Sequence, residues 1–159
     1  MSQVHNLWKT TTGLPVVGSS IGKRVFSLAF AQKAPYFATI HPRVADLRPN
    51  YCEVHIPKRR GVQNHIGTVH AIALCNGLEM AMGGLAEATI PSTKRWIPKG
   101  MTVSYTAKAT SDIVCTAETD QEQWDTAEGD LPVRVKGVRD DGTVVIEGTI
   151  NLWVTSKKK

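Results

Sequence analysis

The sequence lacks several features that would assign it to whole classes of protein. No hydrophobic run approaches the roughly 18 uninterrupted apolar residues of a membrane-spanning helix, and the first residues lack the basic-then-apolar pattern of a secretory signal. The three cysteines, Cys52, Cys75 and Cys115, are odd in number and too widely spaced for a disulfide framework or a CxxC metal site. These absences predict a cytoplasmic protein with no membrane partner and no bound metal.

The sequence also has little excess of charge of either sign. Nineteen Lys and Arg residues against fourteen Asp and Glu give a net charge of +5 over 159 residues, and three of these charges are the C-terminal residues 157–159, which leaves +2 without them. The chain has neither an aromatic RNA-binding cluster nor a recognition-helix pattern. We therefore expect no nucleic-acid partner, and the remaining basic clusters suit a smaller anion, such as a phosphorylated cofactor, equally well.

The length predicts one domain. Residues 1–18 include a Thr-Thr-Thr-Gly run and Pro15, and they are predicted to form an irregular leader. Residues 19–155 are predicted to form the domain, and residues 156–159 a basic tail. A first helix is expected to end before Pro35, because apolar residues precede it at helical spacing. These residues are Ile21, Val25, Leu28 and Ala29.

The segment from His65 to Ala88 predicts a second, longer helix, with Thr68 as its N-cap and its end at about residue 87. Because this helix is apolar nearly all round, we expect it to be enclosed on most sides. Alternating runs predict strands at 38–47, 51–56, 102–110, 113–119, 132–139 and 144–154. Antiparallel strands with short turns around one buried helix predict an α+β fold, in which a curved sheet wraps a central helix.

A single carboxylate stands out in the central helix. Glu79 is the only charged residue between His70 and Glu87. In an otherwise apolar helix its carboxylate is expected to be partly removed from water, which makes it a better proton acceptor near neutral pH. In the alternative interpretation, Glu79 lies on a wet strip of the helix or pairs with a Lys or Arg of the sheet.

The start of the same helix supplies a second candidate group. Unpaired backbone N–H groups at a helix N-terminus stabilise an oxyanion that develops at a carbonyl. Asn64 and His70 flank this start, although Asn64 also fits a turn and His70 a surface or capping position. His70 and Glu79 are nine residues apart, about two and a half turns and roughly 13.5 Å of rise, so they lie on opposite faces. If both serve one site, they come from different subunits of a two-fold homodimer.

The run from Asn64 to Ala71, NHIGTVHA, followed by Glu79, resembles the hotdog-fold acyl-CoA thioesterases. The most similar branch holds the phenylacetate-pathway and Arthrobacter-type 4-hydroxybenzoyl-CoA thioesterases. The resemblance covers residues 36–155, including the Asp141-Gly142 hairpin. It implies a hotdog fold, here with an extra N-terminal helix, and hydrolysis of an acyl-CoA to free acid and CoA. It also implies a homodimer or a pair of dimers, and no cofactor beyond the coenzyme A of the substrate.

The resemblance further implies residue roles. The Ala71 N–H would polarise the thioester carbonyl, helped by Asn64 and His70, and Gly67 would lie against the substrate. Glu79 from the other protomer would activate water or attack the carbonyl directly. The family commonly has Gly at the position of Ala71, and the added methyl narrows the approach of the carbonyl. Coenzyme A carries phosphates, so five basic residues are candidate contacts or, alternatively, solvated surface charges. They are Lys58, Arg59, Arg60, Lys94 and Arg95.

Two other functions on the same fold stay open at this point. A hotdog dehydratase typically has a His-Phe-Pro or Asp-x-x-x-x-His pattern before the helix, and residues 61–67 have neither. A non-catalytic acyl-CoA-binding protein would keep an apolar pocket and would need no buried carboxylate.

Overall fold

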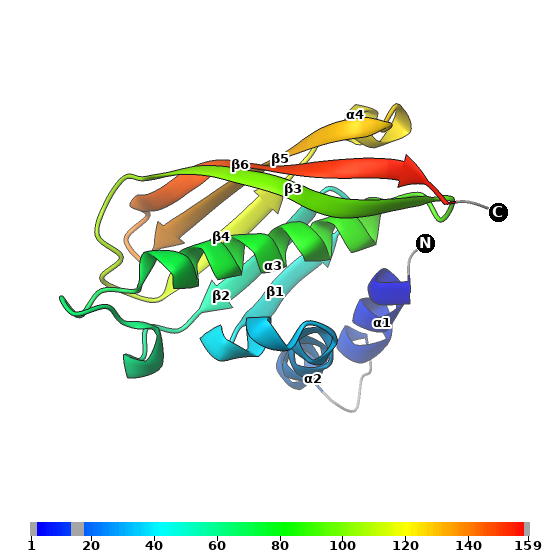
Figure 1. Cartoon of the computed structure of the whole chain (residues 1–159). Helices are drawn as coiled ribbons and strands as arrows, with labels where there is room; N and C mark the ends of the chain where they lie inside the picture. Colours follow the sequence, from blue (N-terminus) through cyan, green and yellow to red (C-terminus); the bar gives the residue numbers. More distant parts are fainter. Residues whose placement is uncertain (1–2, 14–17, 158–159) are drawn as a thin grey trace.

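A computed structural model describes residues 3–13 and 18–157 and contains one six-stranded sheet in the order β1-β2-β4-β5-β6-β3. All neighbouring strands are antiparallel. The strands are β1 (Arg43–Arg48), β2 (Tyr51–Ile56), β3 (Lys94–Tyr105), β4 (Ile113–Glu118), β5 (Gly129–Arg139) and β6 (Val144–Ser156). The sheet curves around the long helix α3 (Ala71–Thr89), which confirms the predicted α+β arrangement (Figure 1).

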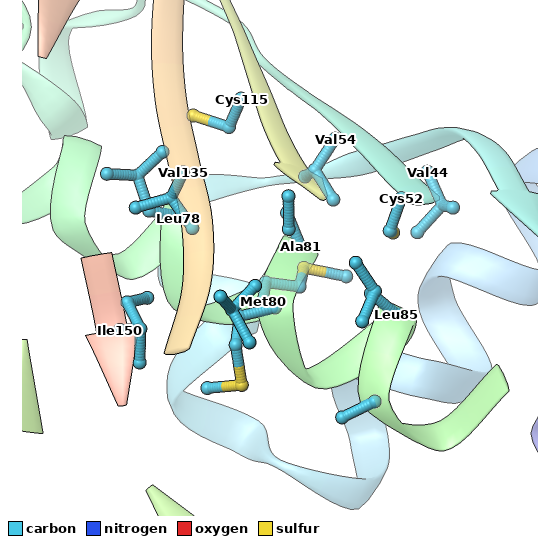
Figure 2. Close-up of a cluster of buried hydrophobic side chains, with 14 of the residues drawn as sticks. Val44, Cys52, Val54, Leu78, Met80, Ala81, Leu85, Cys115, Val135 and Ile150 are labelled. Atoms are coloured by element: carbon cyan, nitrogen blue, oxygen red, sulfur yellow. The ribbon is translucent and has the colours of Figure 1, made fainter. Parts of the chain in front are cut away.

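Helix α3 forms the centre of the core. Leu78, Ala81 and Leu85 have no exposed surface and lie against strand residues such as Val54 (Figure 2). Burying a Leu side chain contributes about 1.5–3 kcal/mol, so the sheet-facing side of α3 supplies much of the stability of the fold. Met80 is also fully buried. Leu78 and Met80 are therefore core residues, and the helix is enclosed on most sides as predicted.

The N-terminal segment differs from the prediction. Residues 3–12, expected to be irregular, form helix α1 (Gln3–Thr12). The predicted first helix is confirmed as α2 (Gly18–Lys33), but its buried side is not the expected one. Phe26 is buried and meets Trp8 edge to face at 5.0 Å, whereas Ile21 and Val25 are exposed. Helical spacing identified the helix, but α2 has apolar residues on two faces, and spacing alone does not say which one packs inward.

Several boundaries also differ from the sequence predictions. Residues 35–40 form the 3-10 helix η1 (Pro35–Ile40), and strand β1 begins only at Arg43. Strand β3 runs from Lys94 to Tyr105, whereas the sequence predicted a strand at 102–110. The first half was missed because Pro98 and Gly100 weaken the strand pattern, and they lie at an irregularity in the pairing with β6. The sequence analysis did not predict the short helices η2 (Arg60–Val62) and α4 (Gln121–Asp125).

The predicted basic tail is only partly described. The Lys157 N–H donates to the Thr93 carbonyl at 2.8 Å, and its side-chain Nζ donates to the Ser92 carbonyl at 2.9 Å. Lys157 is therefore tied to the loop after α3 rather than simply solvated. Lys158 and Lys159 lie outside the described residues.

The two edges of the sheet have different surroundings. Helix α2 covers the β1 edge, where the Val44 N–H donates to Ser27 Oγ at 2.8 Å and Lys23 Nζ donates to the Ala45 carbonyl. The opposite edge is β3, a strand of 12 residues that pairs with β6 on one side and with no described strand on the other. Such an open edge presents unpaired backbone groups to another chain.

Within the described part of the chain, no helix has the length and apolar character needed to cross a bilayer.

The closeness of α3 to the sheet predicts opposite effects for two glycines of this helix. A Cβ at Gly77 would lie 2.3 Å from Ile56 Cδ1 and 2.9 Å from Cys115 Sγ, whereas a Cβ at Gly83 would meet only Trp96, at an ordinary 3.6 Å. We expect Gly77→Ala to lower the free energy of unfolding by about 1–3 kcal/mol through overpacking. Gly83→Ala should raise it by up to about 1 kcal/mol through helix propensity. Urea unfolding of both variants tests this expectation, and equal effects would contradict it.

Candidate active site

The loop before α3 is organised by the side chain of Asn64. Its Oδ1 accepts from the backbone N–H groups of Ile66 and Thr68, both at 3.1 Å, and its Nδ2 donates to Thr68 Oγ1 at 2.8 Å. Gly67 has a φ of +77°, in the left-handed region that favours glycine. Asn64 therefore shapes the turn that leads into α3, which is the turn alternative noted for this residue.

His70, and not Thr68, is the N-cap of α3. Its backbone is extended (φ −64°, ψ 139°), and its Nδ1 accepts from the Ile72 N–H at 3.1 Å. A neutral imidazole that accepts at Nδ1 carries its proton on Nε2. The capping alternative for His70 thus describes this structure, and it leaves the Nε2–H available as a donor.

The Ala71 N–H lies next to this cap at the first position of the helix. It has no acceptor among the described residues, while the N–H groups of Ile72 and Leu74 both bond to His70. A free N–H at the positive end of a helix of 19 residues suits a developing negative charge.

A pocket of about 210 Å³ adjoins this helix start, between η1, η2 and the first turns of α3. Its lining includes His70, Gln63 and Asn76. Asn76 is 5% exposed, and its Nδ2 donates to the Tyr36 carbonyl and to Thr39 Oγ1, both at 3.3 Å. Its Oδ1 is buried and accepts no hydrogen bond from the part of the chain that the structure describes. The sequence analysis missed Asn76, although an Asn among the apolar residues of α3 is a visible signal.

A second pocket, of about 270 Å³, lies farther along α3 against α1 and α2, and Glu79 lines it. Glu79 is half-buried and makes no hydrogen bond or ion pair with any described residue. The alternative in which it pairs with a Lys or Arg of the sheet is therefore not what the structure shows. Most of the lining is apolar: Val4, Phe30, Ala34, Phe37, Met82, Trp96 and Pro98.

A second carboxylate in this pocket is held differently. Glu87 Oε1 accepts from Trp96 Nε1 at 2.9 Å, which fixes Glu87 as a structural partner of the indole. Of the two carboxylates in this pocket, Glu79 is the one that has no partner among residues 3–13 and 18–157.

Burial raises the pKa of the Cys52 and Cys115 thiols, so these cysteines stay protonated and are poor nucleophiles.

Within one chain the two candidate groups stay apart. His70 and Glu79 line different pockets, and the helix between them separates them as their spacing predicts. The described residues 3–13 and 18–157 contain no cluster of three or more His, Cys, Asp or Glu side chains that could hold a metal ion.

The predicted coenzyme A contacts divide between the two ends of α3. Lys58, Arg59 and Arg60 lie near its start, but Arg59 Nη2 donates to the Thr39 carbonyl and so ties the loop to η1. Lys94 and Arg95 lie beyond its other end, where Lys94 Nζ donates to the Ala127 carbonyl. Arg95 Nε donates to Thr155 Oγ1 at 3.1 Å. Arg59, Lys94 and Arg95 thus have structural bonds of their own, while the side chains of Lys58 and Arg60 have no such bond to any described residue.

Comparison with known proteins identifies the family. Residues 22–154 match the model described as "Domain of unknown function (DUF4442)". The chain belongs to the DUF4442 family. No curated protein matches the chain. A crystal structure from structural genomics, whose description gives no function, is 44% identical, with a TM-score of 0.83 over 97% of this chain and 99% of that one.

More distant structures show the fold of this DUF4442 protein. A Pseudomonas aeruginosa protein described as a probable thioesterase is 24% identical, with a TM-score of 0.74 over 82% of this chain and 93% of its own. A Silicibacter pomeroyi protein described as a thioesterase family protein is 18% identical, with a TM-score of 0.69 over 82% and 96%. These similarities confirm the hotdog fold predicted from the resemblance.

The cap at the start of α3 generates a stability prediction. We expect His70→Ala to lower the free energy of unfolding by about 1 kcal/mol, because the Ile72 N–H loses its acceptor. His70→Asn should stay close to the wild type, since Asn is a good N-cap. Thermal or urea unfolding of both variants measures the difference. A His70→Ala protein as stable as His70→Asn would contradict the assigned cap.

Proposed function

We propose that this protein is a thioesterase that hydrolyses an acyl-CoA to the free acid and CoA. The observation that carries the proposal is Glu79, a half-buried carboxylate without a partner among the described residues, at the wall of a mostly apolar pocket. Such a group accepts a proton from water, or attacks a thioester carbonyl, better than a carboxylate held by a cation or a hydrogen bond. The descriptions of the two distant relatives as thioesterases support the same reaction class.

The start of α3 supplies the electrophilic half of the mechanism. The thioester carbonyl oxygen binds at the Ala71 N–H, where the positive end of α3 stabilises the charge that develops during attack. His70 and Asn64 act by position in this proposal. Asn64 holds the turn, and His70 caps the helix with Nδ1 while its Nε2–H faces the same region. Gly67 lies beside the substrate in this proposal, and no atom outside Gly67 itself and its two chain neighbours lies within 4 Å of the position that a Cβ would take there.

A homodimer brings the two halves together. The open β3 edge pairs with the β3 edge of a second copy about a two-fold axis, while α2 occupies the β1 edge. The two α3 helices then run in opposite directions, and Ala71 of one protomer faces the partner's Glu79. One symmetric contact creates two such sites. A pair of such dimers would leave each site unchanged.

The pockets suggest how an acyl-CoA lies in this site. The acyl group enters the apolar pocket beside Glu79, where Met82 and Phe37 adapt to its shape. Lys58 and Arg60 of one protomer take the phosphates of coenzyme A. Because the two α3 helices are antiparallel, Lys94 and Arg95 of the second protomer lie near Lys58 and Arg60 of the first. All four residues then contribute positive charge to the phosphate-binding end of the site.

Replacing Glu79 tests the catalytic role directly. We expect Glu79→Gln to lower kcat on acyl-CoA substrates by at least about 100-fold, because the amide cannot take a proton or attack the carbonyl. Glu87→Gln is the matched control: it changes a carboxylate of the same pocket, and its amide oxygen still accepts from Trp96. Free thiol release from short, medium, long and aromatic acyl-CoAs is the measurement. Wild-type protein without activity on any of these, or Glu79→Gln with wild-type rates, would refute the proposal.

The shared site makes a second prediction. Proline is well tolerated at the first position of a helix, and the extended backbone of His70 suits a residue before proline. Ala71→Pro should therefore preserve the fold, remove one N–H and reduce kcat by about 100- to 1,000-fold. Co-expression of Ala71→Pro with Glu79→Gln should restore activity, since a mixed dimer contains one site with both groups intact. Failure to recover activity in purified mixed dimers would show that the two groups do not act in one shared site.

A further inference from the structure

Helix α2 has an exposed apolar face in addition to its buried one. Phe26 is 1% exposed and packs inward, while Ile21, Val25 and Leu28 are 57%, 49% and 67% exposed. These three residues recur at i, i+4 and i+7, so they form one stripe on the outer side of the helix. A helix that is apolar on opposite faces is normally covered on both. The stripe is therefore an apolar surface that the described residues leave uncovered.

The charge of the protein indicates what kind of partner fits this surface. Residues 1–45 contain five Lys or Arg and no Asp or Glu, whereas the rest of the chain contains fourteen of each sign. All of the net charge of +5 thus lies in the segment that contains α1, α2 and the start of β1. A second copy on the stripe would bring two of these positively charged segments together. An anionic partner matches the charge.

A pocket beside the stripe adds positive charge at a defined place. It has a volume of about 430 Å³ and lies between α2, η1 and the start of β1. Leu28 belongs to both the stripe and this pocket, and Ala31 and Pro42 extend its apolar wall. Arg24 and Arg43 line the same pocket, and Arg43 is oriented by His55, whose Nδ1 lies 3.1 Å from Arg43 Nη2. Two guanidinium groups beside an apolar wall suit a phosphate that carries hydrocarbon chains.

We propose that the outer face of α2 docks on the surface of an anionic lipid bilayer. Ile21, Val25 and Leu28 enter the boundary between headgroups and acyl chains, and Arg24 and Arg43 bind lipid phosphates. The contact is peripheral and requires no spanning segment. It departs from the expectation of no membrane partner that we drew from the lack of such a segment, and it is independent of the chemistry proposed for Glu79.

Vesicle sedimentation with the full chain tests this docking. We expect the wild type to sediment with vesicles of phosphatidylcholine and phosphatidylglycerol in equal parts, but not with phosphatidylcholine alone, and to be released by added salt. The combined change Ile21→Ser, Val25→Ser and Leu28→Ser should lower binding by at least about tenfold. The pair Arg24→Glu and Arg43→Glu should do the same, because it reverses the charge that meets the phosphates. All of these residues are surface positions, so circular dichroism should show unchanged folds.

Ile66→Ser is the matched control, since Ile66 is 57% exposed, as Ile21 is, but lies in the loop before α3. It should bind vesicles like the wild type. Wild-type protein that ignores the mixed vesicles, or a triple Ser variant that binds them as tightly as the wild type, would overturn the proposal. Light scattering supplies a further check: a lower molar mass for the triple Ser variant in solution would identify the stripe as a contact between copies and would also overturn it.

Discussion

The enclosure of helix α3 is the constraint on which the rest of the structure depends. Its 19 residues are apolar nearly all round, so one face of a sheet cannot bury all of its apolar surface. The curved sheet covers one side, where Gly77 allows Ile56 to approach the helix backbone. Helix α1 and the 3-10 helix η1 contact part of the other side (Figure 1), and Phe30 of α2 lines the pocket that remains there. Glu79 lies where this second cover leaves a pocket, so the exposure of the carboxylate follows from how the helix is packed.

The same enclosure explains how much of the fold could be predicted from the sequence. A long apolar helix followed by alternating runs and short turns is a strong signal, and the central helix and strands β2, β4 and β6 lie close to their predicted positions. Strand β3 was harder because Pro98 and Gly100 interrupt its pattern. Helix α1 was missed because a Thr-Thr-Thr run and Pro15 are typical of loops. Its stability comes from tertiary contacts such as Trp8 on Phe26, which no local pattern reveals.

The sequence analysis named candidate groups for a site, but it could not fix how they are arranged. The spacing of His70 and Glu79 fixes opposite faces of one helix, and the structure keeps them in separate pockets. The spacing of residues left the roles of His70 and Asn64 open, and local hydrogen bonds determine them. Nδ1 of His70 caps the helix in place of the predicted Thr68, and Asn64 Oδ1 accepts hydrogen bonds within the turn before α3. Asn76 escaped notice because its significance lies in an unpartnered Oδ1, which depends on how η1 packs against α3.

The difference between the sheet edges determines how the two proposed surfaces relate. Hydrogen bonds from Val44 to Ser27 and from Lys23 to Ala45 close the β1 edge with α2, so pairing of copies through the sheet is left to β3. The stripe of Ile21, Val25 and Leu28 faces away from the surface with which α2 covers this edge. A bilayer on α2 and a second copy on β3 therefore use different elements of one protomer. Phe30 of α2 and Trp96 of β3 both line the pocket of Glu79, so the elements that carry the two proposed surfaces meet at the proposed acyl site.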